Sequence, residues 1–464
     1  MFEPSIAPSG TLLGLLQRGR GDGTLHALAA PRADALAALN QCVLSDPRRD
    51  WQVENRSLYY ARLYVDLDGP LGAVEAHLFS ADDLLDDDEN RTGLALSVLG
   101  HLASYGRDDA LMLLRRYAAT GANWSWALDE LAVRDDDAGL RSLGAPVLAR
   151  FPETPEGAAR LAAAVRDAYE PRPWRLWEEL PQFTARLSAA REQGSFDRWQ
   201  RQMTPAGPRP GWSVDAVFEW AEQGLRRGTP LHVPAARCLA AVATPEDRPR
   251  ILAAAATGTE AARATALHHL VTAEPENPAV LDLIEAAAED DAVVAAYERL
   301  LTEAAVDRAR AWVHRPDALG AAAGRMLAAH GDATDAPLVL GALRESVRTS
   351  GPDAAALWPL VDGTGRLHIG CAAPVLRHIY RETASSHLRG RAAAALSATD
   401  PSFATGFAVE CLWDCEESTR EIAARHAETG DARVVDRLRR LAADPAEEEE
   451  VQSAVRSRMD PRVG

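Results

Sequence analysis

The sequence predicts an all-α protein built from repeated helical hairpins, and three observations support this prediction. The 464 residues divide into apolar-periodic stretches of about 10–16 residues that alternate with clusters of Gly, Pro, Asp and Asn. β-branched runs with a period of two, which are typical of strands, are nearly absent. Ala, Leu, Arg and Glu, which favour helices, dominate the composition, and similar stretches recur along the chain.

The range 432–443 is the clearest single helix. Four apolar residues form one stripe along it: Val434, Val435, Leu438 and Leu441. This spacing predicts an amphipathic helix with one buried face. Asp431 precedes it as a candidate N-cap, and Asp444-Pro445 ends it because a residue before proline avoids the helical conformation.

Internal repeats relate distant parts of the chain. The segment 388–400 matches 419–431 at an offset of 31 residues, with an arginine, paired alanines and a closing aspartate in common. The segment 262–270 fits the same template, and a second helix type recurs in 106–119 and 430–443. Because one hairpin cannot cover its own apolar face, we expect such units to stack on their neighbours.

These segments resemble HEAT repeats of the kind found in phycobilisome-lyase-type proteins. The whole chain is similar to actinobacterial HEAT-repeat-domain proteins of unassigned function. The resemblance implies an armadillo-like α-solenoid, in which antiparallel hairpins stack into a right-handed superhelix. It also implies that Arg263, Arg389 and Arg420 correspond to the HEAT arginine, which bonds an aspartate of a neighbouring repeat and has a structural role.

Charge and aromatic content divide the chain into three predicted parts. Residues 1–168 form an N-terminal helical-repeat array with a net charge of −9, and residues 229–464 form a C-terminal HEAT-like array with −10. Residues 169–228 have a net charge of +1 and are rich in Trp, Arg and Pro. We expect this central segment to be irregular or to form a joint between the two arrays.

The central segment supplies most of the candidate partner-binding residues: Arg172, Trp174, Arg175, Trp177 and Trp199. Trp beside Arg is typical of protein–protein hot spots. Trp at helical spacing is more often part of a packed core. The sequence leaves open whether this segment is core or interface.

A second candidate surface is the Gly-rich loop 362–370, which carries Arg366 and His368. The loop separates two helical stretches. It is interpreted either as a simple connector or as a contact surface for a partner.

The sequence offers no motif for catalysis or ligand binding. Cys411 and Cys415 are four residues apart but lack the further ligands of a zinc site. The acidic stretch 82–90 lacks the spacing of a calcium loop, and all 50 basic residues are Arg, so a phosphate-loop lysine is missing. We therefore predict a non-enzyme, with no catalytic residues, no cofactor and no metal.

The net charge of −18 argues against nucleic acid or an anionic membrane as the main partner. The five scattered cysteines fit reduced thiols in the cytosol. The N-terminus does not resemble a secretory signal, and no apolar stretch is long enough to span a membrane. We expect a cytoplasmic protein without membrane contact; the sequence leaves the oligomeric state open.

The predicted function is a non-enzymatic, protein-binding scaffold or adaptor, whose acidic flanks favour a basic protein partner. One alternative is a HEAT-like DNA glycosylase or lyase-type enzyme that uses the central Trp/Arg surface. The nearly neutral charge of that segment would allow few phosphate contacts. Another alternative is a regulatory subunit of a larger complex.

Overall fold

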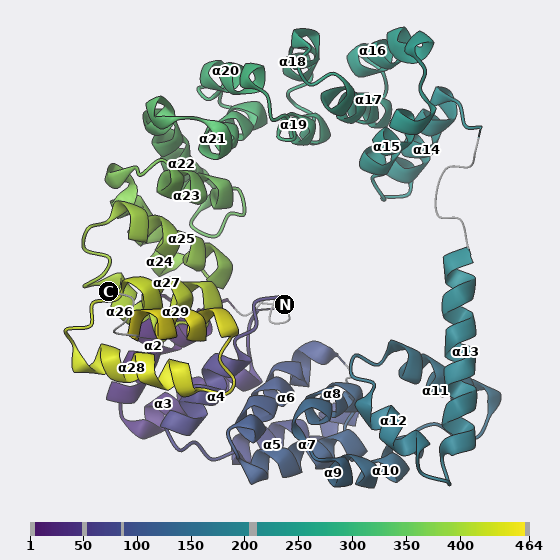
Figure 1. Cartoon of the computed structure of the whole chain (residues 1–464), viewed down its shortest axis with the longest axis vertical. Helices are drawn as coiled ribbons and strands as arrows, with labels where there is room; N and C mark the ends of the chain where they lie inside the picture. Colours follow the sequence, from purple (N-terminus) through teal and green to yellow (C-terminus); the bar gives the residue numbers. More distant parts are fainter. Residues whose placement is uncertain (1–4, 49–52, 85–87, 204–210, 460–464) are drawn as a thin grey trace. The chain divides into compact units, whose positions relative to one another are not determined.

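The computed structural model describes residues 5–48, 53–84, 88–203 and 211–459, without the side chains of residues 82, 84 and 195–203. These ranges consist of α-helices and four short 3-10 helices joined by turns, and no strand occurs in them (Figure 1). The predicted all-α class is confirmed.

The chain divides into two compact units. The first unit contains residues 1–205, 383–393 and 402–464, so it combines both ends of the chain. The second unit contains residues 206–382 and 394–401. Helix α25 (Ser386–Thr399) begins in the first unit and ends in the second.

The helices of the first unit are α1 (Leu12–Gln17), α2 (Gly21–Ala29), α3 (Arg32–Leu44), α4 (Ser57–Asp66), α5 (Gly72–Leu78), η1 (Ala81–Leu84), α6 (Glu89–Ser104), α7 (Asp108–Thr120), α8 (Trp124–Arg134), α9 (Asp137–Ser142), α10 (Gly144–Leu148), α11 (Pro155–Asp167), α12 (Arg172–Glu178), α13 (Thr184–Met203), α26 (Phe407–Cys411), α27 (Glu417–His426), α28 (Ala432–Ala443) and α29 (Glu449–Met459). Those of the second unit are α14 (Val214–Arg226), α15 (His232–Val242), η2 (Pro245–Asp247), α16 (Arg248–Thr257), α17 (Glu260–Ala273), α18 (Pro278–Ala286), α19 (Asp291–Tyr297), α20 (Glu303–Trp312), α21 (Ala318–His330), η3 (Ala333–Asp335), α22 (Ala336–Ser350), α23 (Leu357–Arg366), η4 (Gly370–Ala372) and α24 (Ala373–Glu382).

Local sequence signals set the helix boundaries. Helix α28 has the predicted bounds, and the Asp431 side chain caps it by accepting a hydrogen bond from the Arg433 N–H at 2.8 Å. Three residues of its apolar stripe are fully buried: Val434, Leu438 and Leu441. The amphipathic pattern therefore places one face of α28 in the core, as expected.

Helices pack on their next neighbours and also on their second neighbours along the chain. In the second unit α15, α17, α19, α21 and α23 form a series in which each helix packs on the following member. The intervening helices α16, α18 and α20 form a similar series. Each helix pair therefore covers the apolar face of the pair before it, and the core runs along the unit.

Buried arginine–carboxylate pairs connect successive helix pairs of the first unit. Arg389 donates two hydrogen bonds to the Asp414 carboxylate at 2.7 and 2.9 Å, and both side chains are fully buried. Arg420 donates two to the Glu447 carboxylate at 3.0 and 2.6 Å. Each guanidinium and carboxylate meet as two parallel hydrogen bonds, the geometry that best offsets the cost of burying both charges.

Arginine–carboxylate pairs also occur in the second unit, where the arginine side chains are more exposed, 28% for Arg263 and 35% for Arg310. Arg263 donates to Asp290 at 2.9 Å, and Arg310 donates to Asp335 at 2.8 and 3.0 Å. All four pairs of the two units are separated by 25 or 27 residues. Each of the three arginines singled out in the sequence has the ion pair that the resemblance implies, with a glutamate in place of aspartate in one pair.

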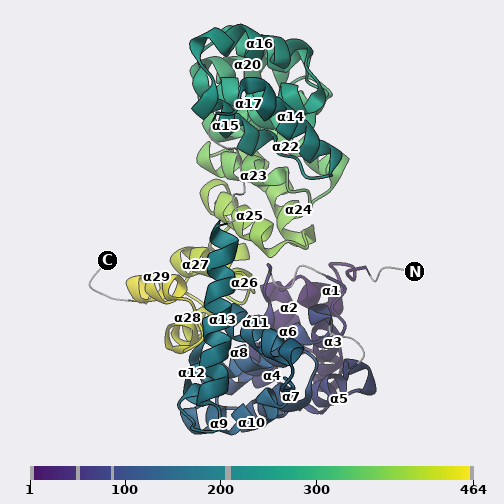
Figure 2. The ribbon, with the colours of Figure 1, turned by 90° about the vertical axis from the view of Figure 1, so that its right-hand side faces the viewer.

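The two ends of the chain pack together within the first unit. Helix α2 packs on α26, as both views of the ribbon show (Figures 1 and 2). Arg62 of α4 donates to Asp444 at 2.9 Å and to Glu447 at 3.0 Å. Glu447 therefore binds one arginine from each end of the chain.

Replacement of Asp414 by alanine should strongly destabilise the protein, because the Arg389 guanidinium would stay buried without its carboxylate. We expect a loss of about 3–5 kcal/mol in the free energy of unfolding, measured by urea denaturation at neutral pH. Glu345→Ala is the control, since it removes the carboxylate of an exposed pair with Arg348 and should leave stability unchanged. Similar small losses in both variants would contradict this role of the buried pair.

Candidate functional site

The two tryptophans of the candidate site lie in the core of the first unit. Trp174 and Trp177 of α12 are 6% and 0% exposed. Their rings meet edge to face with centroids 5.0 Å apart, and Trp177 Nε1 donates to the Leu140 carbonyl at 2.7 Å. The buried N–H group is thus satisfied within the protein. Trp177 has no exposed surface to offer a partner, and Trp174 has very little.

Arg172 and Arg175 lie on the same helix but differ in their contacts. Arg172 Nη1 donates to the carbonyls of Ala132 and Asp135 at 2.8 and 3.0 Å. It therefore places a cation at the C-terminal end of α8, where the unsatisfied carbonyls favour it. Arg175 is exposed, and its side chain makes no hydrogen bond or ion pair with the described residues.

Arg366 of the second unit has the same role as Arg172. It donates to the carbonyls of Ala328 and Leu327 at 2.9 and 3.3 Å, in the last turn of α21. His368 is exposed, has a positive φ of 50°, and approaches the Ala398 carbonyl at 3.4 Å. The predicted loop 362–370 is wrong in its first part, because α23 extends through Arg366 and includes the glycines at 363 and 365. The contacts of both side chains with backbone carbonyls support a structural role for this segment. Trp199 falls in α13, at a position whose side chain is outside the described residues.

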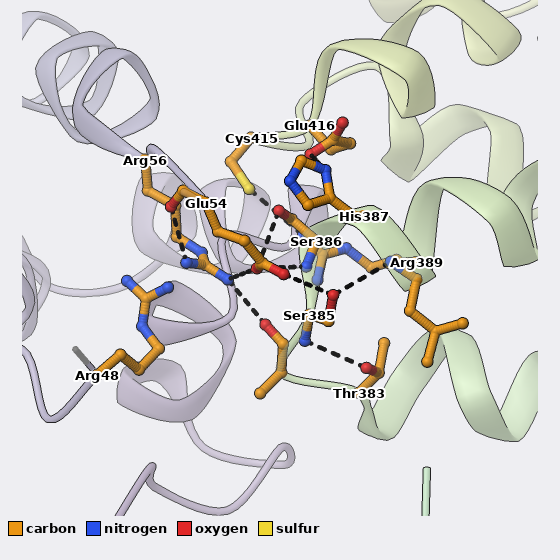
Figure 3. A network of polar contacts seen from close by, with 12 residues as sticks. Arg48, Glu54, Arg56, Thr383, Ser385, Ser386, His387, Arg389, Cys415 and Glu416 are labelled. Carbon is orange, nitrogen blue, oxygen red and sulfur yellow. Dashed lines mark hydrogen bonds and ion pairs between the residues drawn. The ribbon is translucent and has the colours of Figure 1, made fainter. Parts of the chain in front are cut away.

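A buried polar network joins the two chain ends in the first unit (Figure 3). The Glu54 carboxylate, which precedes α4, accepts hydrogen bonds from Ser385 Oγ at 2.5 Å and from Ser386 N at 2.7 Å. Ser386 is the first residue of α25. A carboxylate from the N-terminal part of the chain thus caps a helix more than three hundred residues later, where the helix dipole favours negative charge.

Arg56 holds this carboxylate in place. Its Nη2 donates to Glu54 Oε2 at 2.8 Å and to the Ala384 carbonyl at 2.7 Å, and its side chain is fully buried. At the edge of the network, His387 Nδ1 lies 3.2 Å from the Glu416 carboxylate (Figure 3). Because the contacts of Glu54 and Arg56 fix the segment before α4 to the start of α25, we assign this network a structural role.

A groove of about 960 Å³ opens on the second unit. It crosses three successive helix pairs, α14/α15, α16/α17 and α18/α19. The first residues of α15, α17 and α19 line it: His232, Glu260 and Asp291. Apolar side chains form its walls, and one of them, Leu225, is 39% exposed.

This groove carries an excess of negative charge. Its lining contains four carboxylates, from Glu260, Glu289, Asp290 and Asp291, and a single arginine, Arg263. Arg263 pairs with Asp290 at 2.9 Å, which leaves three carboxylates. The side chains of these three residues are exposed and make no hydrogen bond or ion pair within the described part of the chain. We call this feature the acidic groove.

His232 lines the acidic groove, and its ring meets that of His268, which is not part of the lining, at an angle of 56°. The rings of His232 and His268 have centroids 4.9 Å apart. His268 is buried, and its Nδ1 lies 3.0 Å from the Ala264 carbonyl. Burial is the main cause that lowers the pKa of His268 to about 4, and the nearby His232 and Arg299 contribute to this shift. The His268 ring is therefore neutral at physiological pH.

Other classes of site were sought in the same ranges. Among the described side chains, no group of three or more His, Cys, Asp or Glu is placed to hold a metal ion. The described helices include none that is long and apolar enough to cross a membrane. No family model, no curated protein and no solved structure matches this chain.

Sequence patterns alone did not single out the acidic groove, although they contain a signal for it. Thr259-Glu260 and Asp290-Asp291 each combine an N-cap residue with an acidic first residue of a helix. Glu260 and Asp291 are 31 residues apart, the offset of the internal repeat. Carboxylates that recur at the repeat offset and at the same helix position are expected to lie on one edge of a repeat array.

Replacement of Trp177 by alanine tests the core assignment. Removal of a fully buried indole should cost about 3–5 kcal/mol of unfolding free energy, measured by urea denaturation followed by circular dichroism. The control is Arg175→Ala on the same helix. This variant should be as stable as the wild type, because the Arg175 side chain makes no hydrogen bond or ion pair with the described residues. A Trp177→Ala protein of wild-type stability would contradict the core assignment.

The stability of the second unit should depend on pH through His268. Its pKa in the folded state is about 4, below the ordinary value of 6.5, so between these values the unfolded chain binds the proton more tightly. The contribution of His268 to the free energy of unfolding is therefore fully present above pH 6.5 and decreases as the pH falls toward 4. Urea denaturation across this pH range should show that the unfolding free energy of His268→Asn depends less on pH than that of the wild type. The same pH dependence in both proteins would contradict the role assigned to His268.

Proposed function

We propose that this protein is a non-enzymatic, protein-binding scaffold built on HEAT-like repeats. Two regularities support the repeat architecture. Helices pack on their second neighbours in long series, and arginine–carboxylate pairs recur at separations of 25 or 27 residues. Both are expected of an α-solenoid, in which each helix pair stacks on the pairs beside it; the contacts between the two chain ends in the first unit are additional to this pattern.

The acidic groove is the observation that carries the binding function. It is long enough to cross three helix pairs and it combines an apolar wall with three unpaired carboxylates. Exposed apolar surface next to charge of one sign is typical of a surface that binds a partner. These features support our proposal that the helix pairs themselves form a recognition surface.

The partner that fits this groove is a basic protein segment with at least one apolar side chain. Arg or Lys side chains would meet Glu260, Glu289 and Asp291, while the apolar side chain would pack against Leu225. Complementary charge would accelerate association and favour basic segments over acidic ones. The net charge of the whole chain, −18, also favours basic segments.

The alternative of a glycosylase or lyase-type enzyme depended on an exposed Trp/Arg surface in the central segment. Trp174 and Trp177 are core residues and Arg172 caps a helix, so these three residues give that alternative no support. We also propose a cytoplasmic location, to which the five free cysteines are suited.

A charge reversal in the acidic groove should weaken binding of a basic peptide. The probe is a short fluorescent peptide of Arg, Lys and Leu, and the measurement is its anisotropy during titration with protein. Glu260→Arg should raise the Kd about fivefold or more, and added salt should raise the Kd of the wild type, because the contacts are ionic.

The matched control is Glu303→Arg. Glu303 is likewise the exposed first residue of a helix, α20, but it lies outside the acidic groove. Both substitutions change the net charge of the protein equally. A difference between their Kd values for the basic peptide would therefore come from the position of the charge. Equal Kd values for the two variants would show that the peptide binds through net charge alone, which contradicts the proposed site.

A further inference from the structure

The first unit has a smaller groove of the opposite charge. It lies where α11, α12 and α13 meet and has a volume of about 270 Å³. Three arginines line it: Arg166, Arg175 and Arg191. Glu178 is the single carboxylate of the lining. We call this feature the cationic groove.

The three guanidinium groups are not equally available. Arg191 pairs with Glu178 at 2.8 Å, and Arg166 donates to Asp167 at 2.8 Å. Arg175 is exposed and has no partner among the described residues. The groove therefore presents one unpaired guanidinium in a chain with 68 acidic and 50 basic residues.

The floor of the cationic groove is apolar and buried. Trp174 and Leu187, which line it, are 6% and 2% exposed. Gly194 of α13 also lines it, and a Cβ atom there would lie 3.0 Å from the Cβ of Arg166. The absence of a side chain at Gly194 thus permits the close approach of α13 to α11 that shapes the groove.

We propose that the cationic groove binds an acidic peptide segment. A carboxylate of the segment would meet the planar guanidinium of Arg175 in two parallel hydrogen bonds, with Arg191 nearby. An adjacent apolar side chain would pack on Trp174 and Leu187. The volume fits one or two side chains.

The surroundings favour a peptide over a nucleic acid. Asp167, at 60% side-chain exposure, and Glu178 place negative charge beside the groove. A run of phosphates would meet these carboxylates, whereas a single side-chain carboxylate can bind Arg175 and avoid them. Tyr169, two residues before Pro171 of the lining, is 84% exposed.

This second site does not depend on the acidic groove, because it lies in the other unit and has the opposite charge. The two grooves together would let one chain bind a basic and an acidic segment, which is the property required of an adaptor. The experiment therefore follows both peptides on each variant.

The test uses the full chain and a short fluorescent peptide of Asp, Glu and Leu, followed by anisotropy. Arg175→Ala should raise the Kd of this peptide about tenfold, while the Kd of the basic peptide stays unchanged. An equivalent peptide with Asn and Gln in place of Asp and Glu should not bind. Arg439→Ala, which removes an exposed arginine elsewhere in the same unit, should leave the Kd of the acidic peptide unchanged.

Three results would overturn the proposal. Equal binding of the acidic peptide by Arg175→Ala and the wild type would show that the groove is not its site. Inorganic phosphate or single-stranded DNA could also displace the fluorescent peptide more strongly than unlabelled peptide does. If Arg175→Ala abolished this displacement, the groove would be assigned to phosphate ligands. No binding of the acidic peptide to the wild type would leave the groove without the proposed partner. Failure of the basic peptide to bind would affect only the function proposed for the acidic groove.

Discussion

Buried pairing of arginine with aspartate or glutamate is the interaction on which this structure most depends. A charged group that leaves water without a partner costs several kcal/mol, so a buried guanidinium tolerates few alternative arrangements. Arg389 meets Asp414, and Arg420 meets Glu447, with almost no exposure of either side chain. Hydrophobic packing drives the helix pairs together, while these ionic pairs specify which helix pair lies beside which.

The same interaction explains two features that bear on function. Glu447 also binds Arg62, and Glu54 caps α25, so both ends of the chain contribute to one compact unit. In the second unit, the pair between Arg263 and Asp290 lies within the acidic groove. It fixes the backbone at the start of α19 and leaves the neighbouring carboxylates free, so a structural element of the repeat also shapes the proposed binding surface.

Local features could be predicted from the sequence, and long-range ones could not. Apolar periodicity and capping gave the bounds of α28, and the repeat pattern singled out Arg263, Arg389 and Arg420. The contact between Glu54 and Ser386 leaves no local pattern, because its partners are 332 residues apart. Trp174 and Trp177 could not be assigned to core or surface, since α12 has only seven residues, too few for a reliable apolar period.

The most direct test of this account is hydrogen–deuterium exchange of the Glu447→Gln protein. Loss of this one carboxylate charge should weaken the contacts of Arg62 on α4 and of Arg420 on α27 together. The account predicts faster exchange of the amides in both Ser57–Asp66 and Glu417–His426, although these helices belong to opposite ends of the chain. Faster exchange confined to Glu417–His426, with α4 unchanged, would contradict it.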